Sequence, residues 1–261
     1  MNKDLDFIQY GKLIMCLDNN GSTIFQFINY DEKIEDVLKK IDDEGIYKVI
    51  SIFDVSNRYS KIDTFEPISK RALDYAIKMH SGQYRKGGLE YITHPIKVAE
   101  YVSKFKESHN IDVLRAASYL HDTLEDTNAT YYDLVNKFGP EVASIVLELT
   151  TDKELKNLVG KTNYLKIKMK NMSSWALVIK LCDRLDNVSD LMERDEKFRN
   201  KYVEETTEIL NYLINNRILS GTHIAIIKQI LSFIKKCNVQ NKEVEPVILD
   251  IDRKVKQLTY I

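Results

Sequence analysis

Residues 119–127, YLHDTLEDT, crowd four ionisable side chains into a stretch that otherwise reads as a buried helix. These are His121, Asp122, Glu125 and Asp126. On a helix, residues four apart lie one above the other, so the histidine and the glutamate share one face and the two aspartates share the next. Three carboxylates so close together repel one another unless a cation lies among them. The stretch therefore predicts half of a metal site that activates water.

The overall charge of the chain excludes some classes of partner. The 261 residues carry a formal net charge of −1, from 38 Lys plus Arg and 39 Asp plus Glu. This balance gives no electrostatic footprint for nucleic acid or for an anionic membrane, and we expect neither as a partner. No apolar run approaches the roughly 18 to 20 residues that span a bilayer, and the first ten residues lack the pattern of a signal peptide. We expect a cytoplasmic protein.

The three cysteines give no sign of a structural bridge or of a thiolate metal site. Cys16, Cys182 and Cys237 are far apart in the sequence and odd in number. This spacing argues against a disulfide framework and against a cysteine-based zinc site. Any metal site in the chain is therefore predicted to use nitrogen and oxygen ligands.

The first 64 residues differ in texture from the rest of the chain. Short apolar runs flank Asn19-Asn20-Gly21, which is a hairpin signal. The pattern predicts a small β-β-α-β unit with strands at 12–18 and 23–29, a helix at 31–43 and a strand at 47–55. This unit has no histidine and no cluster of catalytic residue types. We expect an accessory role for it, through a protein partner, self-association or regulation.

From residue 68 onward, apolar residues recur at helical spacing almost throughout. The spacing predicts helices at 69–80, 95–105, 112–126, 130–137, 139–151, 162–171, 173–193 and 199–216, with another from 221. The expected architecture is mainly α. It has a small α+β unit at 1–64, an all-helical domain at 65–216, and a helical C-terminal extension at 217–261 packed on that domain.

The other half of the metal site is predicted from two further segments. His94 stands directly before Pro95 at the start of a helix, where its ring is not committed to the helix core. Asp183 lies among apolar positions of a second helix, and an unpaired carboxylate would be costly to bury there. Asp183 therefore needs a cation, which is either a metal or an internal ion pair with Arg184 or Arg85.

Two polar neighbours of Asp183 can share its surroundings. Lys180 lies one turn before Asp183 and Asn187 one turn after it, so all three can face one cavity. The candidate ligand set then comprises two imidazoles and two carboxylates, from His94, His121, Asp122 and Asp183. Mixed nitrogen and oxygen ligands without thiolate suit Mn²⁺, Fe²⁺, Co²⁺ or Mg²⁺ better than structural zinc.

Three motifs in this chain resemble those of a known family. They are HSGQYRKGGLEYITHPIKVA at 80–99, ASYLHDTLEDT at 117–127 and IKLCDRLDNVSDL at 179–191. In this order they resemble the hydrolase domain of the RelA/SpoT alarmone family, a branch of the HD phosphohydrolases, and looser agreement covers roughly residues 68 to 215. The resemblance implies an all-helical HD fold. It also implies an Mn²⁺-dependent enzyme that removes the 3′-diphosphate from the guanine nucleotides ppGpp or pppGpp, releasing pyrophosphate and GDP or GTP.

The same resemblance implies roles for individual residues. By motif position, the metal ligands are the quartet His94, His121, Asp122 and Asp183, and the residues that align and activate the attacking water are Glu125 and Asp126. The implied nucleotide contacts are Arg85, which would stack on or pair with the guanine nucleotide, and Lys86 and Asn187 near the base or phosphates. We add Lys180 to the substrate-binding residues, because it faces the same predicted cavity.

Three positions depart from the family pattern. Asp186 stands where the family usually has His or Tyr, Ser189 where Arg is common, and Gly87 where Ser is frequent. An extra carboxylate and one cation fewer should weaken the binding of a highly anionic nucleotide.

Two alternative functions therefore remain. One is an HD phosphohydrolase that acts on another nucleotide, such as the 2′-phosphate of NADPH. The other is a regulatory protein that senses a nucleotide without turning it over. The intact pair Glu125 and Asp126 argues against the second alternative.

Overall fold

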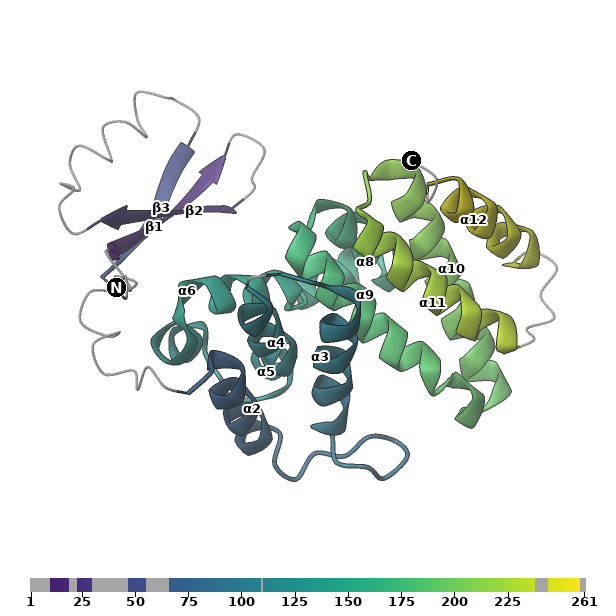
Figure 1. Ribbon diagram of the computed structural model, residues 1–261, viewed down its shortest axis with the longest axis horizontal. Helices are drawn as coiled ribbons and strands as arrows, with labels where there is room; N and C mark the ends of the chain where they lie inside the picture. The colour runs from purple at the N-terminus through teal and green to yellow at the C-terminus, as the bar shows by residue number, and fades with distance from the viewer. Residues whose placement is uncertain are drawn as a thin grey trace, which may run out of the picture. The chain divides into compact units, whose positions relative to one another are not determined.

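The apolar runs of the N-terminal unit form a three-stranded antiparallel sheet (Figure 1). Its strands are β1 (Tyr10–Asp18), β2 (Thr23–Asn29) and β3 (Tyr47–Asp54), in the order β2-β1-β3. The three predicted strands are thus confirmed. The computed structural model describes residues 10–18, 23–29, 47–54, 66–108, 110–237 and 244–258, and the helix predicted at 31–43 lies outside them.

The chain divides into two compact units, residues 1–65 and 66–261, and the second is helical, which confirms the mainly α prediction. Its helices are α2 (Ile68–Met79), α3 (Thr93–Phe105), α4 (Ile111–Leu120), α5 (Thr123–Asp126), α6 (Tyr131–Leu149), α7 (Lys153–Val159), α8 (Lys161–Asn171), α9 (Ser174–Ser189), α10 (Glu196–Asn216), α11 (Gly221–Lys236) and α12 (Val244–Leu258), with a 3-10 turn η1 at Leu191–Glu193. Within this unit, α2 to α6 gather on one side and α8 to α12 on the other (Figure 1).

Helix α9 lies at the centre of the helical unit, in contact with α3, α4, α6, α10 and α11. Its apolar residues, including Leu177, Ile179, Leu181 and Leu185, are fully buried. Because neighbours surround the helix on several faces, its charged residues are buried as well. This burial is what brings Asp183 and Asp186 into the interior of the protein.

The start of α9 is fixed by a hydrogen-bonded cap. The Ser173 hydroxyl accepts a hydrogen bond from the Ala176 backbone N–H at 3.2 Å, as an N-cap residue does. Ser173 also donates from its own hydroxyl to the Glu148 carboxylate of α6 at 2.7 Å. These bonds hold the beginning of α9 against the end of α6.

Two features of the helices differ from the sequence prediction. The helix predicted at 112–126 is interrupted at His121 and Asp122, between α4 and α5. The short helix α7 was not predicted, and its seven residues include no buried side chain that would give a clear apolar stripe. The break predicted near residue 138 does occur, as a sharp kink at Gly139 within α6.

The kink at Gly139 requires a backbone conformation that residues with a Cβ adopt only under strain. Gly139 has φ 86° and ψ 163°, a region used almost only by glycine. We expect Gly139→Ala to lower the free energy of unfolding by about 1–3 kcal/mol, measured by urea titration. Gly87→Ala is the matched control, since Gly87 has no positive φ and a Cβ there would meet no atom within 4 Å. Equal stability of the two variants would contradict this account of the kink.

The docking of α11 depends on a neutral histidine. His223 is buried, its Nδ1 accepts from the Ser220 backbone N–H at 3.1 Å, and its Nε2 lies 3.1 Å from the Ser174 carbonyl oxygen of α9. Burial lowers the pKa of His223 below its ordinary value of 6.5, against the effect of the Ser174 carbonyl and with the help of Arg217 and Lys106.

Because the folded state disfavours the charged imidazole, stability is fully present above pH 6.5 and falls as pH drops below that value. We expect the melting temperature of the wild type to fall more steeply between pH 7.5 and 5.5 than that of His223→Gln, which does not titrate there. Parallel pH profiles of the two proteins would contradict this prediction.

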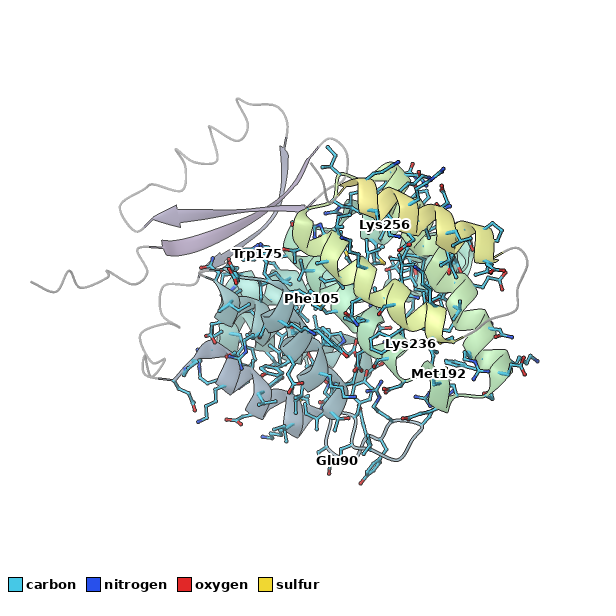
Figure 2. All side chains as sticks on the ribbon, turned by 45° about the vertical axis from the view of Figure 1, so that its right-hand side comes forward. Glu90, Phe105, Trp175, Met192, Lys236 and Lys256 are labelled. Atoms are coloured by element: carbon cyan, nitrogen blue, oxygen red, sulfur yellow. The ribbon has the colours of Figure 1, made fainter. Side chains whose placement is uncertain are left out.

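The C-terminal helices belong to the same compact unit as the rest of the helices. Helix α11 packs on α9, and α12 packs on α10 and α11 with Val244, Ile251 and Val255 buried. Figure 2 shows the side chains filling the space between these helices, with Lys236 at the end of α11 and Lys256 near the end of α12. No helix in the described part of the chain is long and apolar enough to cross a membrane.

Candidate metal centre

The break between α4 and α5 releases His121 and Asp122 from the regular helix. The last carbonyls of α4 are satisfied by side chains: Thr123 Oγ1 donates to the Leu120 oxygen at 2.7 Å, and His121 Nδ1 lies 2.8 Å from the Ser118 oxygen. Side-chain bonds of this kind compete with the helical ladder and end it. The histidine ring is thereby held with its other nitrogen, Nε2, available.

His94 is brought to the same place by α3. It lies in the first turn of that helix, directly before Pro95, where a proline is tolerated. His94 is buried, and its ring meets the ring of His121 edge-on with centroids 5.1 Å apart. Its Nε2 is 3.2 Å from Asp183 Oδ1 and 3.8 Å from Asp122 Oδ2. Residues from three separate helical segments thus converge.

The converging groups form a nitrogen and oxygen cluster that fits a cation. His94, His121 and Asp183 are all buried, and each offers one ligand atom within 4.8 Å of the others. His121 Nε2 is buried with no hydrogen-bond partner among the described residues, an orphaned lone pair that a metal would use. Asp122 lies beside them, with Oδ2 3.0 Å from His121 Nε2.

Asp122 is itself held by a residue that the sequence prediction did not single out. The Tyr91 hydroxyl donates to Asp122 Oδ2 at 2.5 Å. Burial raises the pKa of Tyr91, and the adjacent Asp122 carboxylate raises it further, so the phenol keeps its proton to donate. Tyr91 lies three residues before His94 within the first motif, and an aromatic hydroxyl so near a predicted ligand is the signal that could have identified it.

The alternative of an ion pair between Asp183 and Arg184 or Arg85 is wrong. Arg184 points away from Asp183 and binds Glu205 at 3.1 Å and Thr206 at 2.9 Å. Asp183 instead pairs with Lys180, whose Nζ is 2.9 Å from Oδ2.

Asn187 completes the surroundings of Asp183, with Nδ2 donating to Oδ1 at 2.7 Å. The structure therefore brings together Lys180, Asp183 and Asn187, the three residues that the sequence places around one cavity. One oxygen of Asp183 faces the ammonium of Lys180, and the other faces His94 and the Asn187 amide.

Opposite charges set the protonation of the centre in the absence of metal. Burial lowers the pKa of His94, but its hydrogen bonds to Asp183 and Asp186 and the nearby carboxylate charges outweigh burial and raise the pKa to about 9. Burial raises the pKa of Asp183, but Lys180 and the two imidazoles hold it well below its ordinary value. Burial likewise opposes charge on Asp122, yet His121 and His94 keep its pKa low. Asp122 and Asp183 therefore remain ionised, and His94 beside them is held in its protonated form.

Glu125 and Asp126 are the last two residues of α5, shortly after the same break. Glu125 Oε2 accepts a hydrogen bond from the Thr151 backbone N–H at 3.1 Å, a contact that no sequence signal indicated. Partial burial raises the pKa of Asp126, and the charges of Asp122 and Glu125 raise it further. Gln83, from the loop after α2, donates to the Asp126 carbonyl oxygen at 2.9 Å. This arrangement fixes the orientation of α5 relative to the candidate metal ligands.

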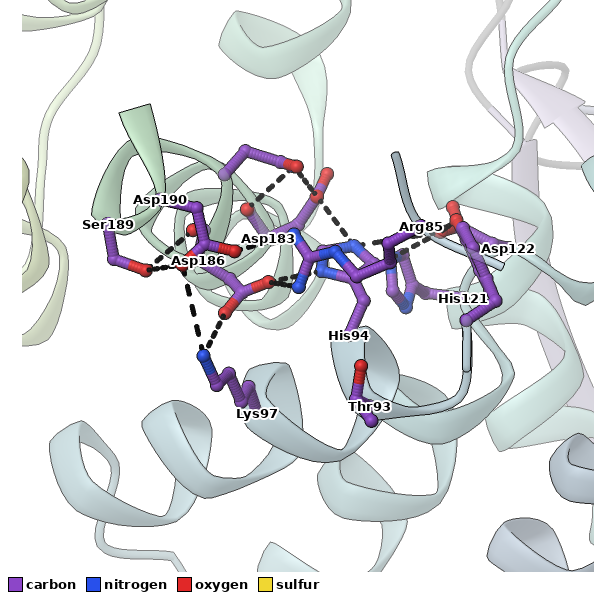
Figure 3. A network of polar contacts seen from close by, with 12 residues as sticks. Arg85, Thr93, His94, Lys97, His121, Asp122, Asp183, Asp186, Ser189 and Asp190 are labelled. Carbon is purple, nitrogen blue, oxygen red and sulfur yellow. Dashed lines mark hydrogen bonds and ion pairs between the residues drawn. The ribbon is translucent and has the colours of Figure 1, made fainter. Parts of the chain in front are cut away.

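The two basic residues of the loop between α2 and α3 both make contacts within the protein. The Arg85 guanidinium is not open to solvent: Nη1 lies 2.8 Å from Asp186 Oδ2, and Nη2 lies 3.3 Å from Asp190 Oδ2 (Figure 3). Lys86 lies with its ammonium 5.1 Å from the ring centroid of Phe198 in α10, a cation–π contact. Both residues tie the loop to the helices on the other side of the unit.

Asp186, the extra carboxylate relative to the family pattern, is completely buried, with Oδ2 in contact with Arg85 and His94. Its charge is therefore paired inside the protein. Ser189, another departure from the family pattern, donates from Oγ to the Asp186 carbonyl oxygen at 2.7 Å.

Residues 72–218 match the family model described as the HD domain. This chain belongs to the HD-domain family. HD domains bind divalent metals, and the cluster of His94, His121 and Asp183 lies inside the matched region of this one.

Relatives of this HD domain extend the comparison. A guanosine-3′,5′-bis(diphosphate) 3′-pyrophosphohydrolase of Aquifex aeolicus is 37% identical over 142 residues, which are 54% of this chain and 20% of the relative. One of Danio rerio is 34% identical over 157 residues, which are 59% of this chain and 85% of the relative. The chain thus spans only a small part of the bacterial relative and most of the Danio rerio one.

A solved structure has the same helical fold. It is described as a metazoan ortholog of SpoT that hydrolyses ppGpp and plays a role in starvation responses. It aligns with a TM-score of 0.57 at 25% identity, over 66% of this chain and 97% of that one. The sequence resemblance to the RelA/SpoT hydrolase domain and the predicted all-helical HD fold are confirmed.

Proposed function

We propose that this HD domain hydrolyses the 3′-diphosphate of ppGpp or pppGpp, giving GDP or GTP and pyrophosphate. The observation that carries the proposal is the convergence of His94, His121 and Asp183 in one buried cluster, with Asp122 beside it. The relatives named as pyrophosphohydrolases of guanosine bis(diphosphate) support the choice of substrate.

The residues around the cluster suit Mn²⁺, because the donors are imidazole nitrogens and carboxylate oxygens without a thiolate. In this proposal the ion is held by His94, His121, Asp122 and Asp183. When bound, it supplies positive charge that polarises a phosphate oxygen and makes water more acidic.

Residues of the chain would activate the water and stabilise the charge that develops on the phosphate. Glu125, held by the Thr151 N–H, orients the attacking water and accepts its proton, and Asp126 shares in this alignment. Lys180 and Asn187 already contact Asp183 and would lie beside the phosphates of a bound nucleotide. Their charge and hydrogen-bond donors offset the negative charge that builds on the phosphoryl oxygens.

The two basic residues of the loop between α2 and α3 complete the proposed nucleotide site. Arg85 is held at the edge of the metal centre by Asp186 and Asp190, and we assign it to contact with the guanine nucleotide. Lys86, anchored over Phe198, lies in the same loop and would face the base or the phosphates. The first 64 residues keep the accessory role predicted for them, in contact with a protein partner or a second copy, and the cytoplasmic location also stays a prediction.

A nucleotide panel tests the proposal. The full chain with Mn²⁺ is incubated separately with ppGpp, pppGpp and NADPH, and pyrophosphate and phosphate are measured apart. We expect pyrophosphate in step with GDP or GTP. Release of phosphate from NADPH, with the guanine nucleotides left intact, would show that the enzyme acts on the alternative substrate instead. Tight binding of ppGpp without product would favour a nucleotide sensor.

A further inference from the structure

Asp186 is a completely buried carboxylate whose bonded oxygen receives two donors. Figure 3 shows Asp186 in contact with both His94 and Arg85. Oδ2 lies 2.6 Å from His94 Nδ1 and 2.8 Å from Arg85 Nη1. The other oxygen, Oδ1, has no hydrogen-bond partner among the described residues, and the nearest ammonium, that of Lys97, is 4.0 Å away. A buried charge is tolerated only when it is paired and hydrogen-bonded. Among the described residues, this carboxylate therefore accepts hydrogen bonds only from His94 and Arg85.

The contact with His94 decides which ring nitrogen faces the centre. In a neutral imidazole one nitrogen carries the proton and the other carries the lone pair, and the partner of the first fixes the tautomer. If Nδ1–H donates to Asp186, the lone pair is on Nε2, the atom 3.2 Å from Asp183 Oδ1. We propose that Asp186 is a positioning residue of the metal centre: its carboxylate orients His94 and leaves Nε2 to bind the cation.

The second histidine of the centre shows what is special about this contact. His121 has the same arrangement, with Nδ1 2.8 Å from an acceptor and Nε2 facing the cluster, but its acceptor is the Ser118 backbone carbonyl. A carbonyl fixes the ring without adding charge, whereas an ionised carboxylate also makes the imidazole a stronger donor to a metal. The two ligands are therefore held by unlike partners, and a side-chain substitution can remove the partner of His94 alone.

The same oxygen ties Arg85 to the centre. Arg85 also contacts Asp190, whose carboxylate touches neither imidazole of the centre. Removing Asp186 would therefore disturb both His94 and Arg85, while removing Asp190 would disturb Arg85, Lys97 and Ser189 and leave the contact between His94 and Asp186 in place. This difference supplies a matched control four residues further along the chain, at the C-cap of α9.

The inference rests on the metal centre of the proposed function, so its test uses the metal alone and no nucleotide. The full chain is stripped of metal, and Mn²⁺ binding is measured by titration calorimetry for the wild type, Asp186→Asn and Asp190→Asn. Asparagine keeps the shape of the side chain and removes its charge. We expect Asp186→Asn to bind Mn²⁺ about 10- to 100-fold more weakly and Asp190→Asn to bind it as the wild type does.

A double variant separates the two contacts of Asp186. If an unpaired Arg85 caused the loss, Asp186→Asn combined with Arg85→Met would regain wild-type affinity, and the inference would be overturned. It would also be overturned by wild-type affinity in a folded Asp186→Asn protein. Weak binding in both the single and the double variant supports it. Because no nucleotide is present, a wrong substrate assignment leaves this result untouched.

The wild-type protein offers a test that does not depend on a variant folding. With ¹⁵N-labelled histidine and diamagnetic Zn²⁺ as the probe, NMR distinguishes a ring protonated on Nδ1 from one protonated on Nε2. We expect His94 to keep a slowly exchanging proton on Nδ1 and to bind the metal through Nε2. Metal bound through Nδ1, or an Nδ1 proton in rapid exchange with water, would contradict the role of Asp186.

Discussion

Glu125→Gln should lower kcat by about 10²- to 10⁴-fold and leave the affinity for Mn²⁺ unchanged. The substitution removes a group that accepts a proton, but the amide oxygen can still accept the Thr151 N–H bond that holds this side chain. The local fold should therefore persist. Pyrophosphate release from ppGpp measures the rate, and calorimetry measures the metal.

Glu100→Gln is the control for this experiment, because Glu100 is an exposed residue of α3, the helix that carries His94. It should match the wild type in both measurements. Nearly full activity of the Glu125→Gln protein would show that Glu125 takes no part in the reaction. A parallel loss of metal binding would instead make Glu125 part of the metal centre.

Asp183→Asn should abolish metal binding and also destabilise the metal-free protein. Lys180 and Asp183 have side chains only 16% and 12% exposed, so the substitution leaves a largely buried ammonium without its partner. Removing one member of such a pair costs about 3–5 kcal/mol. Urea unfolding in the presence of a chelator measures this loss without a contribution from bound metal.

The double variant Asp183→Asn with Lys180→Met separates stability from metal binding. Methionine removes the unpaired charge, so we expect most of the stability to return while Mn²⁺ binding stays lost. Asp190→Asn, at the C-cap of the same helix but outside the cluster, should change stability much less. If the double variant remained as unstable as the single one, the ion pair would not be the cause of the loss.

Local sequence patterns identified most of the elements because the residues that form them are close together in the chain. The helical spacing from residue 68 predicted the stripes that pack around α9, and it predicted a break near residue 138, where the kink at Gly139 occurs. The break after Leu120 was missed, since it depends on the His121 ring and the Thr123 hydroxyl taking helical carbonyls. Spacing alone does not distinguish such a bond from a continuing helix. Helix α7 was missed because it buries no side chain.

The sequence by itself determined the chemistry of the centre, because residue type decides what can bind a cation. Two imidazoles and several carboxylates without a thiolate pointed to an oxygen-loving divalent metal, and the motif order pointed to the HD family. Only the tertiary structure decided the partners of each charge. Asp186 is three residues beyond Asp183, but its contacts come from His94 and Arg85, on another helix and a distant loop. Sequence spacing gives the face of a helix on which a residue lies, whereas the group that it meets there depends on how the helices pack.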